Sequence, residues 1–110
     1  MMGFGPYKGR AAEMGRKLPG QGREVGFSLC KDAAGHIVKG PTAVGTANRV
    51  SIPIRCPHGS RFYGFYHTHP GSGSSVQPSE MDIASARSSG AKVTCIETAS
   101  RMQCYRIIPG

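Results

Sequence analysis

The sequence predicts an α+β domain in which helices flank one β-sheet. Two segments, residues 7–18 and 79–89, carry apolar residues at helical spacing, and several shorter segments between and after them have the composition of strands. The chain has 110 residues, the length of one domain, and contains no internal repeat. We therefore expect a single domain that spans residues 1–110.

The N-terminal half is expected to form a helix and then a hairpin. The helix covers residues 7–18 and ends at a Pro-Gly pair. Apolar residues then alternate with smaller or polar ones from residue 24 to 31, and residues 32–35 form a turn before residues 36–38. The sequence therefore predicts two antiparallel strands that this turn connects.

The next expected elements are two strands, a loop and the second helix. Residues 50–54 alternate as a short strand, which Pro53 would place at an edge or a bulge, and residues 61–69 are rich in aromatic residues. Residues 70–78 form a Gly/Ser loop. The helix over residues 79–89 would pack with Met81, Ile83 or Ala84, and Ala86, and would end at Gly90.

The C-terminal hairpin pairs residues 92–97 with residues 102–108 and would set Cys95 opposite Cys104. No two of the four cysteines form a Cys-x-x-Cys pair. We expect reduced, partly buried cysteines, as in a reducing compartment, although a Cys95–Cys104 bridge remains an alternative.

Composition limits the classes of protein to consider. The sequence has 14 Lys and Arg against 6 Asp and Glu, a net charge of +8, half of it in residues 1–23. This basic N-terminal arm would suit an acidic protein or a nucleic acid. The sequence has no membrane-length apolar run and no signal-peptide core, so we expect a soluble, cytoplasmic protein without membrane contact. The oligomeric state is left open.

A His-Thr-His sequence is the first sign of a metal site. His67 and His69 are two residues apart in a predicted strand, so both side chains project from one face. A catalytic zinc site usually has three protein ligands, and Asp82, at the start of the following helix, is the candidate for the third. The competing interpretation is that Ser79 and Asp82 only cap the helix.

These fragments occur in an order that resembles the JAMM (JAB/MPN-type) zinc metallopeptidase family. The family pattern is a Glu, then His-x-His-Pro, then Ser-x-x-Asp, and this chain has Glu24 in EVGFSL, HTHP at residues 67–70 and PSEMD at residues 78–82. The resemblance covers essentially the whole chain. It implies a mixed, curved, cytidine-deaminase-like sheet flanked by helices, with zinc where the strand, the loop and the helix meet.

The resemblance also implies a role for each matching residue. His67, His69 and Asp82 would hold Zn²⁺, with a water as the fourth ligand. Glu24 would take a proton from that water and pass it to the leaving amine, and Ser79 would help to stabilise the tetrahedral oxyanion. His36 and His58 match nothing in the pattern, so we expect both at the surface.

The implied activity is hydrolysis of a peptide or isopeptide bond in a protein substrate, such as a conjugate of a ubiquitin-like modifier. A non-catalytic scaffold that binds a protein partner is one alternative, although such members tend to lose ligands. A basic nucleic-acid-binding domain is another, with Tyr63, Phe65 and Tyr66 as stacking surface or, in the competing interpretation, as core. Twelve residues separate His69 from Asp82, two more than is usual in the family.

The apolar content gives a further reason to expect a metal. Leu, Ile, Val and Phe make up 19 of the 110 residues, which is little for a stable core. A metal ion held by residues of several elements would connect parts of the fold that packing holds weakly. We therefore expect removal of zinc to lower the melting temperature.

Overall fold

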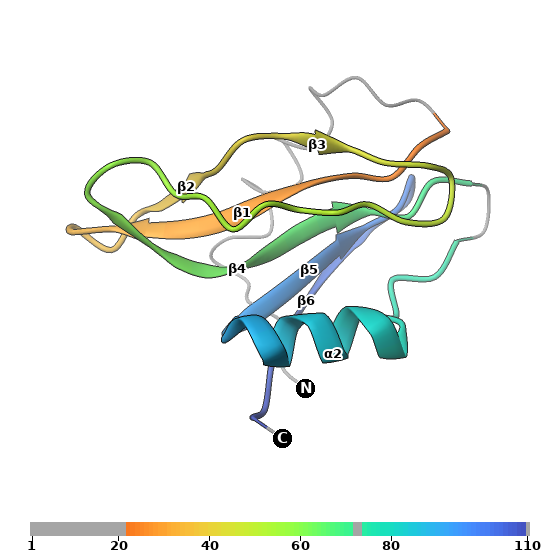
Figure 1. Cartoon of the computed structure of the whole chain (residues 1–110). Helices are drawn as coiled ribbons and strands as arrows, with labels where there is room; N and C mark the ends of the chain where they lie inside the picture. Colours follow the sequence, from red (N-terminus) through yellow and green to blue (C-terminus); the bar gives the residue numbers. More distant parts are fainter. Residues whose placement is uncertain (1–21, 72–73, 110) are drawn as a thin grey trace.

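The computed structural model describes residues 22–71 and 74–109. This part of the chain has one six-stranded sheet and one helix, which confirms the α+β class (Figure 1). The elements are β1 (Val25–Asp32), β2 (Ile37–Lys39), β3 (Ala43–Val44), β4 (Ser60–Thr68), α2 (Glu80–Ser89), β5 (Val93–Glu97) and β6 (Met102–Arg106). The predicted helix over residues 7–18 lies outside the described residues.

The sheet is mixed, with the strand order β2-β1-β4-β5-β6, and β3 pairs with β1 beside β2. Strand β4 lies at its centre, antiparallel to β1 and parallel to β5. Both predicted hairpins are confirmed, including the register that sets Cys95 opposite Cys104. The connection from β4 to β5 runs through α2, which is the usual way to join two parallel strands.

Helix α2 lies against one face of the sheet (Figure 1). It begins and ends as predicted, with Ser79 as the N-cap and Gly90, in a left-handed conformation, as the C-cap. Ala86 is fully buried, in a cluster with Phe65 of β4 and with Ala91 and Ile107. Met81 does not pack: it is 64% exposed, contrary to the prediction, because its turn of the helix borders a cavity and not the sheet.

A second cluster of buried side chains includes Phe27 and Leu29 of β1, Tyr66 of β4 and Val93 of β5. Phe27 and Tyr66 stack with their ring centroids 4.6 Å apart. Alternation along β4 assigns Tyr66 to this cluster and Phe65 to the cluster beside α2. The core interpretation of these aromatic residues is therefore confirmed, and His67 continues the face that carries Phe65.

The connecting segment, residues 45–59, leads from β3 to β4 without a strand, so the prediction of a strand at residues 50–54 is wrong. It runs back along the sheet as the yellow-green trace in Figure 1. Side chains hold it: Ser28 Oγ donates to the Pro53 carbonyl at 2.8 Å. Ile52 lies over Gly26, where an added Cβ would be 2.5 Å from the Ile52 side chain. Pro53 also lacks an amide proton for a strand ladder.

The prediction of reduced cysteines is also wrong, because the structure forms two disulfides. Cys95 pairs with Cys104 across the C-terminal hairpin, the alternative that the register allowed. Cys30 of β1 pairs with Cys56 of the connecting segment, 26 residues away. Nothing in the spacing indicated this second bridge, because it depends on how an irregular segment folds back over β1.

Among the described residues, no helix is both long and apolar enough to cross a membrane.

Candidate metal centre

The two histidines lie where β4 ends. His67 is in the middle of the sheet, paired with Gly26 of β1 and Ile96 of β5, and its side chain is 5% exposed. The amide of His69, one residue beyond the strand, donates to the Glu97 carbonyl at 2.9 Å. The Nε2 atoms of His67 and His69 are 3.0 Å apart. The predicted pair of imidazoles on one face is confirmed.

A hydrogen bond sets the tautomer of His69. Its Nδ1 is 2.8 Å from the Ser75 carbonyl oxygen, which can only accept, so Nδ1 carries the proton and donates. In the neutral imidazole, Nε2 then has a free lone pair. A backbone carbonyl that orients a histidine through its other nitrogen is the common arrangement around a protein-bound metal.

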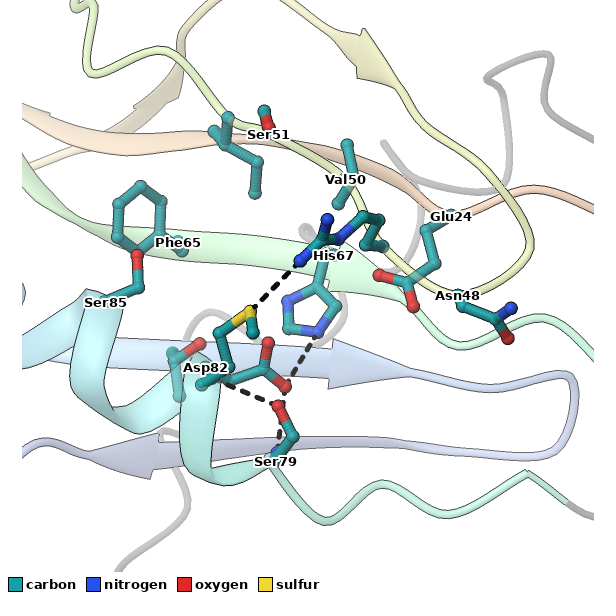
Figure 2. A pocket seen from close by; sticks show the side chains of 13 residues that line it. Glu24, Asn48, Val50, Ser51, Phe65, His67, Ser79, Asp82 and Ser85 are labelled. Carbon is teal, nitrogen blue, oxygen red and sulfur yellow. Dashed lines mark hydrogen bonds and ion pairs between the residues drawn. The ribbon is translucent and has the colours of Figure 1, made fainter.

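Asp82 approaches the histidines from the first turn of α2. Its Oδ2 is 3.4 Å from Nε2 of His67 and 3.8 Å from Nε2 of His69. The same oxygen accepts a hydrogen bond from the Ser79 amide, while Ser79 Oγ accepts one from the Asp82 amide. The capping interpretation is thus confirmed. It does not exclude a role for Asp82 as a metal ligand, because the oxygen that accepts from the Ser79 amide also faces the two histidines (Figure 2).

The three facing atoms have the spacing that a tetrahedral ion requires. Ligand atoms about 2.0 to 2.1 Å from such an ion lie about 3.3 Å from one another. The edges of the triangle formed by His67, His69 and Asp82 are 3.0, 3.4 and 3.8 Å, on either side of that value. The loop between His69 and Asp82 is longer than in the family pattern, yet the Asp82 carboxylate still lies within 3.8 Å of both histidines.

Glu24 lies beside the same pair of histidines. One of its carboxylate oxygens and one nitrogen of each imidazole lie within 4.8 Å of one another, so these three residues could also hold a metal ion. Glu24 is 8% exposed and comes directly before β1. Its backbone is fixed, since its amide donates to Thr46 and its carbonyl accepts from Gly45. Figure 2 shows its side chain on the opposite side of His67 from Asp82.

The two carboxylates have opposite pKa shifts. Burial raises the pKa of Glu24 above 4.5, and the neighbouring histidines only partly offset this. Burial also acts to raise the pKa of Asp82, but its contacts with His67 and His69 outweigh burial and hold the pKa well below 3.8. The interaction with Asp82 is the main cause that raises the pKa of His69 above 6.5. The two shifts favour the ionised form of Asp82 and the protonated form of Glu24.

The centre opens into two cavities. The larger, of about 660 Å³, lies between the connecting segment and α2 and is lined by Arg49, Ile52, Phe65 and Met81 among others (Figure 2). The smaller, of about 330 Å³, is lined by His69, Pro70 and Ser75 among others. Four residues belong to both cavities: Glu24, Asn48, Ser79 and Asp82. The two cavities therefore adjoin at the centre.

Sequence reasoning missed the wall of the larger cavity. Residues 48–52 all line it, whereas the sequence pattern predicts a strand over residues 50–54 and no site in this segment. Only Pro53, which disfavours a central strand, pointed away from that assignment. His36 and His58 are exposed, as predicted.

Comparison of the chain with protein-family models and with curated proteins finds no match.

Proposed function

We propose that the chain is a zinc-dependent metallopeptidase of the JAMM (JAB/MPN) type. The observation that carries this proposal is the triangle of His67, His69 and Asp82, whose edges fit a tetrahedral ion, with Glu24 beside it. The mixed sheet and the position of the centre between β4 and α2 agree with the fold that the family resemblance implies.

Zinc, Glu24 and Ser79 have different roles in the proposed reaction. Zinc, when bound, supplies Lewis acidity toward the scissile carbonyl and lowers the pKa of a bound water. Glu24 accepts the proton of the attacking water and returns it to the leaving amine. Burial suits Glu24 to this role, because its raised pKa brings it nearer to neutrality. The Ser79 hydroxyl accepts from the Asp82 amide through its oxygen and can donate its proton to the developing oxyanion.

We further propose a peptide or isopeptide bond of a protein as the substrate, with conjugates of a ubiquitin-like modifier as the first candidates. Two adjoining cavities at the centre offer room for the residues of a protein chain around the scissile bond. A non-catalytic scaffold is the less favoured alternative, because the chain keeps every residue of the family pattern. Nucleic-acid binding has less support still, since Phe65 and Tyr66 are buried.

The two disulfides favour an oxidising compartment over the predicted cytoplasm, and in such a compartment a plain peptide bond would be the substrate in place of a modifier conjugate. All four cysteines of the chain form the two disulfides, and such bridges persist mainly in secreted, periplasmic or luminal proteins. Thiol titration of the native protein distinguishes the two locations: we expect no free thiol in an oxidising compartment and four in the cytoplasm.

Metal content and hydrolysis together test the proposed function. We expect about one zinc per chain and cleavage of fusions or isopeptide conjugates of ubiquitin-like proteins that a chelator abolishes. His67→Ala should lose both zinc and cleavage, whereas the matched control His36→Ala, at an exposed histidine, should lose neither. Chelator-insensitive cleavage, or stoichiometric zinc in the His67→Ala protein, would contradict the proposal.

A further inference from the structure

One cation of the larger cavity has no role in the proposed chemistry. Arg49 lies in the connecting segment and lines this cavity together with Glu24, His67 and Asp82. Its position is fixed by a tight turn, in which the Thr46 amide donates to the Arg49 carbonyl at 2.8 Å. Thr46 Oγ1 also accepts from the Arg49 amide at 3.3 Å.

The turn is tied directly to the catalytic glutamate. Glu24 donates to the Thr46 carbonyl at 2.7 Å and accepts from the Gly45 amide at 2.8 Å. Gly45 is required there, because an added Cβ would collide with the Arg49 carbonyl oxygen. Glu24 and the backbone of Arg49 therefore belong to one hydrogen-bonded unit, and the place of Arg49 relative to the centre is built into the fold.

The guanidinium itself is weakly engaged. One of its nitrogens lies 3.6 Å from the sulfur of Met81 of α2, which lines the same cavity. A thioether is a poor acceptor, and a guanidinium has five N–H donors. Within residues 22–71 and 74–109, the structure gives Arg49 no ion pair. An arginine so placed can take a carboxylate in bidentate geometry.

Charge points to the same kind of ligand. When a divalent ion is held, its two positive charges are balanced by Glu24 and Asp82, and Arg49 leaves the cavity positive. Ile52 and Phe65 supply apolar wall beside it. Two adjoining cavities meet at the centre, so a substrate chain has room beyond the scissile bond and can offer an internal side chain to Arg49.

We propose that Arg49 is a specificity-determining residue that binds an acidic side chain, Asp or Glu, of the substrate close to the scissile bond. The inference rests on the proposed function, since it takes the metal centre as the place of cleavage. It narrows the substrate class to protein segments with an acidic residue near the cleaved bond. The carboxylate would replace the thioether of Met81 as the partner of the guanidinium.

A binding selection tests this without requiring turnover. A random library of acetylated, amidated hexapeptides is passed over immobilised Glu24→Gln protein, incubated with zinc, and the retained peptides are sequenced. We expect enrichment of Asp or Glu at one position. Arg49→Ala, added to the same protein, should abolish the enrichment, whereas Arg55→Ala, which removes an exposed arginine of the same segment that does not line the cavity, should leave it intact.

The affinities of single peptides then measure the contribution of the contact with Arg49. The selected peptide should bind about tenfold more tightly than its Asn or Gln counterpart, a difference that Arg49→Ala removes and Arg49→Lys restores only in part. Equal binding of the two peptides, or equal loss with Arg55→Ala, would overturn the inference. Zinc content is measured separately: Arg49-dependent enrichment without bound zinc would overturn the proposed function and leave the acidic-ligand site standing.

Discussion

The two walls of the larger cavity are built in different ways. One wall consists of β4 and α2, where backbone hydrogen bonds and a capping box fix His67 and Asp82. The other is the connecting segment, whose chain makes no strand and is held by Ser28, a disulfide and the turn at Thr46. The proposed metal ligands, whose positions must agree to a few tenths of an ångström, lie on the regular wall, and the contacts proposed to recognise substrate lie on the irregular one.

The largest expected effect comes from Asp82 on the regular wall. Asp82→Ala removes a proposed metal ligand and half of the capping box, so we expect zinc affinity and hydrolysis to fall by at least about 100-fold. Loss of the cap should also reduce the free energy of unfolding of the metal-free protein by about 1 kcal/mol. Chelator competition measures the first effect and denaturant unfolding the second.

Glu80→Ala is the matched control for Asp82→Ala. Glu80 is also acidic and in the first turn of α2, but it lines neither cavity. The Glu80→Ala protein should keep its zinc, and its free energy of unfolding should change only slightly, through the interaction with the helix dipole. Equal loss of zinc in both variants would mean that Asp82 acts through helix charge and not as a ligand.

The next largest effect is expected from the disulfide that holds the connecting segment against β1. Replacing Cys30 and Cys56 by serine releases the connecting segment from β1, and we expect the free energy of unfolding to fall by about 3 kcal/mol. We also expect KM to rise more than kcat falls, because the proposed metal ligands lie on the other wall. Denaturant unfolding and steady-state kinetics measure the two effects.

The second disulfide provides the comparison. Replacing Cys95 and Cys104 by serine opens a bridge inside a regular hairpin, over nine residues against 26 for the other bridge. The loss of stability should be smaller and KM should be unchanged. If KM rises when Cys95 and Cys104 are replaced, but not when Cys30 and Cys56 are replaced, the substrate contacts do not lie on the irregular wall.

The pair of His69 and Asp82 makes the metal-free protein sensitive to pH. The raised pKa of His69 means that its contribution to stability is complete below 6.5 and is lost as pH rises through the higher folded value. The lowered pKa of Asp82 means that its contribution is present above 3.8 and is lost only in stronger acid. Burial of Glu24, whose pKa is raised above 4.5, also lowers stability as pH rises. The metal-free melting temperature should therefore fall between pH 6 and pH 8.

Bound zinc should oppose this fall in melting temperature. Metal binding needs unprotonated histidines, so the gap between the zinc-loaded and metal-free melting temperatures should widen over the same interval. Thermal melts at pH 6, 7 and 8, with chelator and with zinc, measure both curves. His69→Gln should flatten them; a metal-free protein that becomes more stable from pH 6 to pH 8 would contradict the assigned pairing.

Sequence predicted the regular wall far better than the irregular one. Period-two alternation located β1, aromatic and strand-like composition located β4 and β5, and the Ser79 and Gly90 caps gave the ends of α2. The order of Glu24, His67, His69 and Asp82 indicated residues that the structure brings together. These features depend on local periodicity and on turns, which a short window of sequence records.

The connecting segment could not be predicted in the same way. Its residues 50–54 alternate like a strand, but Pro53 and the contacts of Ser28 and Cys30 with residues far along the chain decide its conformation. The Cys30–Cys56 bridge and the position of Arg49 over the cavity follow from that conformation. Side-chain contacts between distant residues leave no periodic signal, so this wall and its arginine became visible only in the structure.

The smallest expected effect isolates one contact of the irregular wall. Ser28→Ala leaves the Pro53 carbonyl without its 2.8 Å hydrogen bond, which should reduce the free energy of unfolding by about 1 kcal/mol. Ser88→Ala, at an exposed helical serine that bonds only within α2, is the control and should change stability by less than about 0.5 kcal/mol. Because Ser28 holds the segment that presents Arg49, affinity for the selected acidic peptide should fall with Ser28→Ala and not with Ser88→Ala. Unchanged peptide affinity in a destabilised Ser28→Ala protein would show that the disulfide and the Thr46 turn suffice to position the recognition wall.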